Sequence, residues 1–162
     1  MQQQLTSQQL IEELRDARAR TLELVRDLAD EELLGPKLAI VNPMLWEIGH
    51  VAYFHEFWTL RHLHGCAPMI ANADQLYDSI AIAHDRRWDL PLPSRAQTLA
   101  YMGAVLEAQI DRLASGSVNA SDKYFYRYAV FHEDMHTEAF TYTRQTLGYK
   151  APPLALAVNT DP

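Results

Sequence analysis

The chain has 162 residues and a formal net charge of −7, with 48% hydrophobic and 22% charged residues. A chain of this length buries about two-thirds of its unfolded surface, enough for one compact domain with its own core. The composition excludes a disordered chain, and a single cysteine, Cys66, excludes an internal disulfide framework. The acidic balance, without a basic stripe, argues against nucleic acid or an anionic membrane as the partner.

The N-terminal residues and the hydropathy pattern bear on where the protein resides. Residues 1–4 lead directly into a polar, amphipathic segment and lack the basic and apolar regions of a signal peptide. No apolar run approaches the roughly 20 residues that a membrane-spanning helix requires. We therefore expect a cytoplasmic protein without a membrane span.

Four long helical patterns account for most of the chain. The first covers residues 7–29, where apolar residues recur at helical spacing along one face. The second begins with Asn42 as the N-cap and Pro43 at the first helical position, and it continues to His64, just before Gly65. Proline at the start and glycine after the end are typical helix boundaries.

The third and fourth helices have similar boundary signals. Ser94 and Gln97 form a capping-box pattern for a third helix that runs to about residue 113. Ser121 or Asp122 caps the fourth helix, which ends at Gly148. Two-residue β-hairpin signals such as Asn-Gly are absent from the sequence.

These patterns predict an all-α fold, an up-down four-helix bundle with a long connection between the second and third helices. The bundle is expected to occupy residues 1–150, and residues 151–162 are expected to be a C-terminal tail or linker. The connection covers residues 65–93, which is unusually long for a compact domain. Connections of this length are often functional.

His132, Glu133 and His136 form the most informative motif of the chain. Two imidazoles four residues apart on a helix face the same way and can bind one metal ion. The motif matches HExxH, in which zinc proteases use the glutamate as a general base. The extended protease motif would need Gly at 139 and His at 142, where this chain has Ala139 and Tyr142. Because the 26 residues after His136 carry no further helical pattern, a third ligand must come from upstream.

The second helix offers a candidate for the third ligand. At about 100° per residue, His50 lies in the middle of an aromatic stripe that faces the core. On the fourth helix, His132 and His136 align with apolar residues, so all three histidines point into the bundle. Three histidines suffice for a facial metal site, and neutral imidazole binds zinc, iron, nickel and copper. The ligand set alone leaves the metal open.

Other interpretations of these side chains stay open at this point. His50 can also be a hydrogen-bonded packing residue of the core. His55, His62 and His64 are predicted to be surface or helix-capping residues. Glu133 is either a partner that orients an imidazole or an exposed helix residue.

Four segments carry a resemblance to a known family. They are NPMLWEIGHVAYF at 42–54, LYDS at 76–79, HDRRWDLPLP at 84–93 and HEDMH at 132–136. In this order they resemble the N-terminal DinB-like domain of the ergothioneine and selenoneine synthases of the EgtB and SenA type. The resemblance covers nearly the whole chain.

The resemblance implies a four-helix bundle whose three histidines, here His50, His132 and His136, hold a non-haem iron(II). It further implies an O₂-dependent oxidoreductase that joins a small thiol or selenol to the imidazole ring of hercynine, as in ergothioneine and selenoneine biosynthesis. An arginine after the second helix is implied to hold the sulfur or selenium donor, and Arg87 or Arg86 is the candidate.

Members of that family carry a second, C-terminal domain that resembles formylglycine-generating enzymes and supplies part of the substrate pocket. This chain stops soon after residues 150–153, which resemble the linker to that domain, so we expect a fragment, a protein that uses a partner, or a diverged function. One alternative is a stand-alone DinB-family protein with zinc or nickel that transfers small thiols. A second alternative is a non-catalytic helical module with a structural metal or none.

Overall fold

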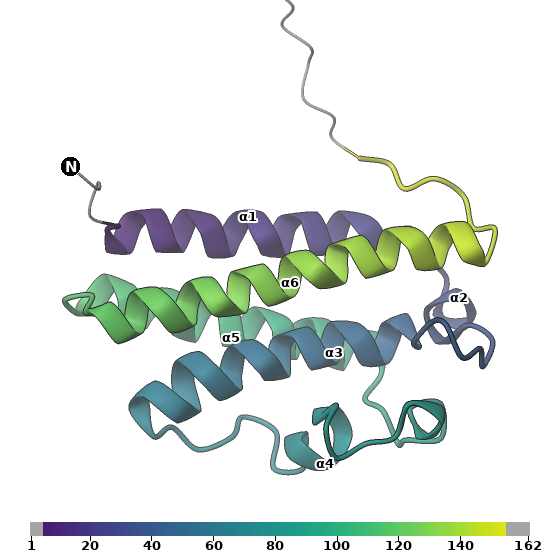
Figure 1. Cartoon of the computed structure of the whole chain (residues 1–162), viewed down its shortest axis with the longest axis horizontal. Coiled ribbons are helices and arrows are strands. Elements are labelled where there is room, and N and C mark those ends of the chain that lie inside the picture. Colours follow the sequence, from purple (N-terminus) through teal and green to yellow (C-terminus); the bar gives the residue numbers. More distant parts are fainter. Residues whose placement is uncertain (1–4, 155–162) are drawn as a thin grey trace, which may run out of the picture.

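The structure is a computed structural model that describes residues 5–154 (Figure 1). Regular secondary structure within this range is entirely helical, and the long helices lie side by side as the predicted up-down four-helix bundle (Figure 1). Residues 155–162, most of the predicted tail, lie outside the described residues. The elements are α1 (Ser7–Val25), α2 (Asp30–Leu34), α3 (Met44–His55), the π-helix η1 (Glu56–His62), α4 (Ala73–Tyr77), the 3₁₀ helix η2 (His84–Arg86), α5 (Arg95–Ser115) and α6 (Ala120–Thr146).

The starts of α5 and α6 depend on capping side chains. Ser94 accepts a hydrogen bond from the backbone of Gln97 and completes the predicted capping box of α5. The N-cap of α6 is Asn119, whose side chain accepts from the backbone N–H of Asp122. The prediction of Ser121 or Asp122 as the N-cap was wrong because Asp122 occupies the third helical position of this capping box. At the other end, Gly148 has a φ of 68°, the left-handed conformation that favours glycine after a helix.

The first predicted helix ends earlier than expected, and the second has a different N-cap residue. The first helix stops at Val25, and a separate short helix, α2, follows, closed at its start by Glu32, which accepts from the backbone N–H of Ala29. Pro43 itself is the N-cap residue of α3. Asn42 does not cap the helix, because its side-chain oxygen accepts a hydrogen bond from Arg87 at 2.7 Å.

The second predicted helix changes type after His55. Residues Glu56–His62 form the π-helix η1 instead of the α-helix that was expected to run to His64. The hydroxyl of Thr59 donates to the carbonyl oxygen of His55 at 2.7 Å, at the boundary between α3 and η1. A π-helix has wider turns, so side chains after His55 no longer follow the 100° register of α3.

Helix α3 is surrounded by protein on several sides. It packs against α5 and α6, and α4 from the long connection covers it further. Trp46 ties α3 to this connection by donating from Nε1 to the carbonyl oxygen of Leu76 at 2.7 Å. Ten of the twelve residues of α3 are buried, as expected of a helix covered all round. His55 is among them, so its predicted surface position was wrong.

The apolar core has two parts. A larger cluster joins α3, α4 and α5, and a smaller one joins α1, α5 and α6. None of the described helices is long and apolar enough to cross a membrane. The smaller cluster consists of Leu10, Ile11, Leu14, Ala17, Ile110, Leu113, Tyr126 and Val130.

Candidate metal centre

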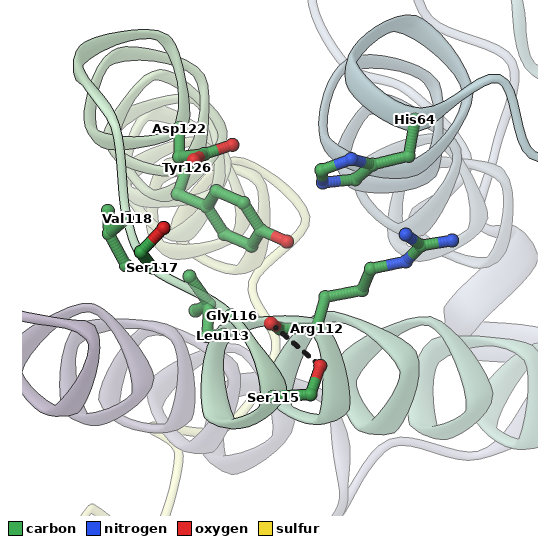
Figure 2. A pocket seen from close by; sticks show the side chains of 9 residues that line it. All are labelled: His64, Arg112, Leu113, Ser115, Gly116, Ser117, Val118, Asp122 and Tyr126. Carbon is green, nitrogen blue, oxygen red and sulfur yellow. Dashed lines mark hydrogen bonds between the residues drawn. The ribbon is translucent and has the colours of Figure 1, made fainter.

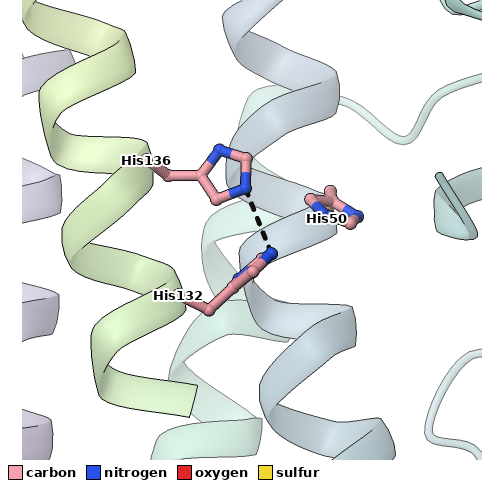
Figure 3. A group of neighbouring side chains, drawn as sticks. All are labelled: His50, His132 and His136. Carbon is pink, nitrogen blue, oxygen red and sulfur yellow. Dashed lines mark hydrogen bonds between the residues drawn. The ribbon is translucent and has the colours of Figure 1, made fainter. Parts of the chain in front are cut away.

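Three histidines converge between α3 and α6 (Figure 3). One ring nitrogen from each of His50, His132 and His136 lies within 4.8 Å of the others. The Nε2 atoms of His132 and His136 are 3.3 Å apart. The ring centroid of His50 lies 5.1 Å from the centroids of both other rings. The structure thus brings together the three side chains that helical periodicity selected.

His50 is fixed by a backbone carbonyl and an aromatic ring. Its Nδ1 lies 2.8 Å from the carbonyl oxygen of Tyr77, which can only accept a hydrogen bond, so Nδ1 carries the proton and Nε2 is left with its lone pair. The ring stacks on Trp46 with centroids 4.8 Å apart. Tyr77 comes this close because residue 49 is glycine: a Cβ on Gly49 would lie 2.4 Å from the Tyr77 ring.

His136 is oriented by a carboxylate that the sequence analysis did not single out. Nδ1 of His136 lies 2.7 Å from Oε1 of Glu47, a side chain that is 1% exposed. A carboxylate acceptor holds the proton on Nδ1 and leaves Nε2 for a metal ion, as in many metal sites. One feature of the sequence could have indicated this role: Glu47 is an acidic residue in an otherwise apolar helical segment, about one turn before His50.

His132 is held by an aromatic ring rather than by a hydrogen bond. Its imidazole lies flat on Phe54, with ring centroids 3.5 Å apart and an interplanar angle of 4°. Within residues 5–154, Nδ1 of His132 is buried without a hydrogen-bond partner. Buried polar atoms without partners are uncommon, and they indicate an unfilled interaction.

The environment keeps two of these imidazoles neutral. Burial, assisted by the charge of His136, lowers the pKa of His50 to about 3. Burial, assisted by the charges of His136 and His50, lowers the pKa of His132 to about 2. Near pH 7 both rings therefore carry a free lone pair, which is the form of histidine that binds metal ions.

The geometry and the donor set fit a divalent metal ion. Imidazole nitrogens bind zinc at about 2.0–2.1 Å, so two nitrogens on one such ion lie about 3.0–3.4 Å apart. The 3.3 Å between His132 and His136 falls in this range, and His50 completes a three-nitrogen face. Within residues 5–154 no carboxylate joins this group, so three neutral donors would leave further positions on the ion open.

Glu133, the acidic residue of the HExxH motif, belongs to a different part of the core. Its Oε1 accepts from Arg18 at 2.9 Å and from Thr21 at 2.8 Å, and its Oε2 lies 3.0 Å from Nε2 of His55. The side chain is 0% exposed, so of the two alternatives for Glu133 the exposed helix residue was wrong. Glu133 does orient an imidazole, but that of His55 rather than one of the converging three. With both oxygens engaged, it is not available as a general base of a protease.

The two candidate arginines differ in position. The guanidinium of Arg87 lies 4.0 Å above the Trp46 ring, and the other neighbour of that ring is His50. Burial lowers the pKa of Arg87, and among the described residues its Nε has no hydrogen-bond partner. Arg86 is exposed. Of the two, Arg87 is the one in contact with the histidine cluster through a shared aromatic ring.

An aromatic groove of about 330 Å³ opens beside His50. It lies between the α3–η1 segment, the start of the long connection after α4, and α6. In this lining, the aromatic residues Tyr53, Phe54 and Phe57 of the predicted second helix lie beside Tyr128 of α6. The lining residues are His50, Tyr53, Phe54, Phe57, Trp58, Asp78, Ser79, Ile80 and Tyr128.

A separate cavity of about 160 Å³ lies where the end of α5 meets the start of α6 (Figure 2). The hydroxyl of the buried Tyr126 points into it, close to Arg112 and His64 (Figure 2). This cavity shares no lining residue with the aromatic groove and contains none of the three converging histidines. It is therefore distinct from the candidate metal centre.

The chain is similar to a protein-family model and to named relatives. The model of the DinB superfamily matches residues 13–140. A hercynine oxygenase of Mycobacterium tuberculosis is 32% identical over 133 residues, which are 81% of this chain and 31% of that protein. A hercynine oxygenase of Mycolicibacterium thermoresistibile is 33% identical over 132 residues, 80% of this chain and 29% of that protein. The chain thus spans less than a third of the length of these relatives.

Proposed function

The chain belongs to the DinB superfamily, and we propose that it is the metal-binding domain of an O₂-dependent enzyme that attaches sulfur or selenium to hercynine. The observation that carries this proposal is the convergence of three histidines, two of them kept neutral by burial. The similarity to two hercynine oxygenases supports hercynine as the substrate.

We propose iron(II) as the metal. Three neutral ligands would leave up to about three positions on an octahedral iron, room for a thiolate or selenolate and for O₂. Bound iron would supply the redox chemistry that joins the two substrates. The absence of a carboxylate from the ligand group suits an anionic sulfur or selenium donor, because no protein anion competes with it.

The residues of the chain have separate roles in this proposal. His50, His132 and His136 hold the metal, while Tyr77 and Glu47 keep the proton on the outer ring nitrogen of His50 and His136. These contacts fix the direction of the lone pairs. The aromatic groove admits substrate beside His50.

Arg87 is proposed to hold the acidic part of the sulfur or selenium donor. Its guanidinium is positioned by Trp46 and Asn42 and retains an unpaired Nε among the described residues. A guanidinium binds a carboxylate through paired N–H donors. Arg86, which is exposed, is the weaker of the two candidates.

A cytoplasmic location fits the presence of a free thiol at Cys66.

A zinc or nickel protein that transfers small thiols is the second candidate. The observation that favours it is the donor set itself, because three neutral imidazoles also suit zinc. Zinc would activate a bound thiol without redox chemistry. The two candidates therefore differ in whether O₂ is consumed.

The test is O₂ uptake by protein loaded anaerobically with iron(II), measured with hercynine and a small thiol together and separately. The proposal predicts uptake that requires both substrates and is lost in His132→Ala. Calorimetric titration with hercynine is the second readout, since binding does not depend on turnover. Hercynine that neither binds the iron-loaded protein nor promotes O₂ uptake would contradict the proposal.

A further inference from the structure

The aromatic groove next to His50 has walls at steep angles to one another. The rings of Phe54 and Tyr128 meet at 60° with centroids 5.1 Å apart, and those of Trp58 and Tyr128 meet at 70° with centroids 5.7 Å apart. One face of Phe54 is stacked on His132 and one face of Trp58 on Phe125, and all three rings line the groove. The face of an aromatic ring carries partial negative charge and attracts cations.

One formal charge lines this groove, and it is negative. Among the described residues, Asp78 is the one charged residue in the lining. Its Oδ1 accepts from the backbone N–H of Ile80 at 2.9 Å, which fixes the carboxylate at the edge of the groove. Within residues 5–154, neither lysine nor arginine lines the groove, so its charge is complementary to a cationic group.

A protein cation already contacts part of the aromatic cluster. The guanidinium of Arg61 lies 5.1 Å from the ring centroid of Phe57, and its charge is paired with Asp74 through two hydrogen bonds of 2.7 and 3.1 Å. Asp78 is in no ion pair among the described residues; its Oδ1 accepts from backbone N–H groups. A cationic ligand would therefore neutralise the negative charge of Asp78 in the groove.

A quaternary ammonium group fits this combination better than a primary ammonium. It has no N–H to donate and is weakly hydrated, so aromatic faces and a nearby carboxylate replace its water at low cost. Hercynine, the trimethylated betaine of histidine, carries such a group a few bonds away from its imidazole. His50 itself lines the groove, so a ligand bound there lies next to this histidine.

We propose that the groove formed by Phe54, Trp58, Tyr128 and Asp78 binds the trimethylammonium group of hercynine and directs its imidazole toward the three histidines. This inference rests on the proposed function, since it assigns one end of that substrate to residues of this chain. It also assigns a selectivity: the groove distinguishes hercynine from histidine. An acidic thiol donor would be repelled by Asp78 and would bind elsewhere.

The experiment is calorimetric titration of the zinc-loaded protein with hercynine and with histidine, and of the metal-free protein with tetramethylammonium. Zinc excludes turnover, and tetramethylammonium tests the groove without the metal. We expect hercynine to bind about tenfold or more tightly than histidine. Asp78→Asn and Trp58→Leu should each weaken binding of hercynine and tetramethylammonium at least severalfold, while zinc content is retained.

Two matched variants serve as controls. Asp85→Asn removes an exposed carboxylate from the same connection, and Phe131→Leu removes a 54% exposed aromatic ring from α6. Both residues are absent from the groove lining, so both variants should bind hercynine like the unaltered protein. Asparagine at 78 retains an oxygen that can accept from the backbone of Ile80, so Asp78→Asn tests charge rather than folding.

Equal binding of hercynine and histidine would overturn the inference. So would unchanged hercynine affinity in both Asp78→Asn and Trp58→Leu with zinc retained. Neither result depends on O₂ chemistry, so the proposed function would still be decided by the uptake assay. Conversely, selective binding in the groove without any O₂ uptake would contradict the proposed activity and leave the groove assignment in place.

Discussion

Adjacent residues of α6 lie in two contrasting polar environments. Glu133 is buried with both oxygens engaged by Arg18, Thr21 and His55. His132, the preceding residue, is half-buried; among the described residues its Nδ1 is buried without a hydrogen-bond partner, and its Nε2 faces another imidazole nitrogen. The first environment joins three helices, whereas the second leaves ring nitrogens available to an ion.

This contrast separates a structural network from a binding site. A buried polar group that is fully paired contributes to one defined packing arrangement, and it has no remaining capacity for a ligand. Buried nitrogens that lack partners cost stability unless something binds them. The residues of the HExxH motif therefore have different roles. Its two histidines belong to the candidate metal centre, and its glutamate connects α6 to α1 and α3.

The largest expected effect is the loss of metal in His132→Ala. Removing one of three ligands leaves two, and the alanine preserves the helix because it has high helix propensity. We expect metal content to fall from one ion per chain to nearly none, with the far-ultraviolet circular dichroism spectrum little changed. His62→Ala, which removes an exposed histidine of η1, is the control and should keep its metal. Stoichiometric metal in His132→Ala would rule out this ligand set.

Glu133→Ala should instead destabilise the fold. It leaves the guanidinium of Arg18 buried without its carboxylate, a change that costs about 3–5 kcal/mol. Urea unfolding of the metal-free proteins measures this difference, and the folded variant should still bind metal. The double variant Arg18→Met with Glu133→Leu should recover part of the loss, because no unpaired charge remains. Loss of metal at unchanged stability would assign Glu133 to the metal site after all.

Glu47→Gln should weaken metal binding without abolishing it. The neutral amide still accepts from Nδ1 of His136 but no longer supplies the negative charge that increases the basicity of the ring. Changes of this kind typically lower metal affinity about 10–100-fold. Competition with a chelator measures the affinity, and Glu138→Gln on the exposed side of α6 is the matched control. Equal affinities of the two variants would contradict the orienting role of Glu47.

A further expected effect is in the pH dependence of the metal-free protein. The pKa values of His50 and His132 fall from 6.5 to about 3 and about 2 on folding, so the unfolded chain binds more protons below pH 6.5. Stability therefore decreases as the pH falls below 6.5. Burial raises the pKa of Glu133, but Arg18 and His55 together outweigh it and lower that pKa below 4.5, so the contribution of Glu133 is lost only below about pH 4.5.

The midpoint of urea unfolding, measured across this pH range, tests whether the histidines lower stability at a higher pH than Glu133 does. His132→Phe removes one of the two titrating imidazoles and should flatten the decrease between pH 6.5 and 4.5. His62→Phe, at an exposed position, should leave the curve unchanged. Constant stability of the unaltered protein across this interval would mean that the histidines are not kept neutral by folding.

Local signals predicted the bundle and the histidine group. The capping box of α5 and the glycine at 148 are read from neighbouring residues. Helical periodicity placed His50 and the pair on α6 toward the core, and the family resemblance grouped the three as metal ligands. Sequence periodicity assumes one α-helical register and one buried face. Both assumptions hold for α1, α5 and α6 over most of their length.

The assumptions of one register and one buried face both fail for the second predicted helix. The π-helix η1 changes the register after His55, and α3 is covered on several faces, so His55 is buried where one apolar face predicted exposure. The partners of Glu47 and Glu133 are equally non-local, because each carboxylate binds a histidine on another helix. Which carboxylate orients which imidazole depends on the packing of α3, α6 and α1, and this is absent from any local pattern.

The most direct measurement is X-ray absorption spectroscopy of the protein loaded anaerobically with iron(II). The contrast between the two environments predicts three imidazole nitrogens bound to iron, with the remaining positions occupied by exchangeable oxygen ligands such as water. Glu133→Ala should give the same spectrum as the unaltered protein if it is folded under the conditions used. A first shell with fewer than three imidazoles, or one that changes when Glu133 is removed, would contradict the assignment of His50, His132 and His136 as the metal ligands.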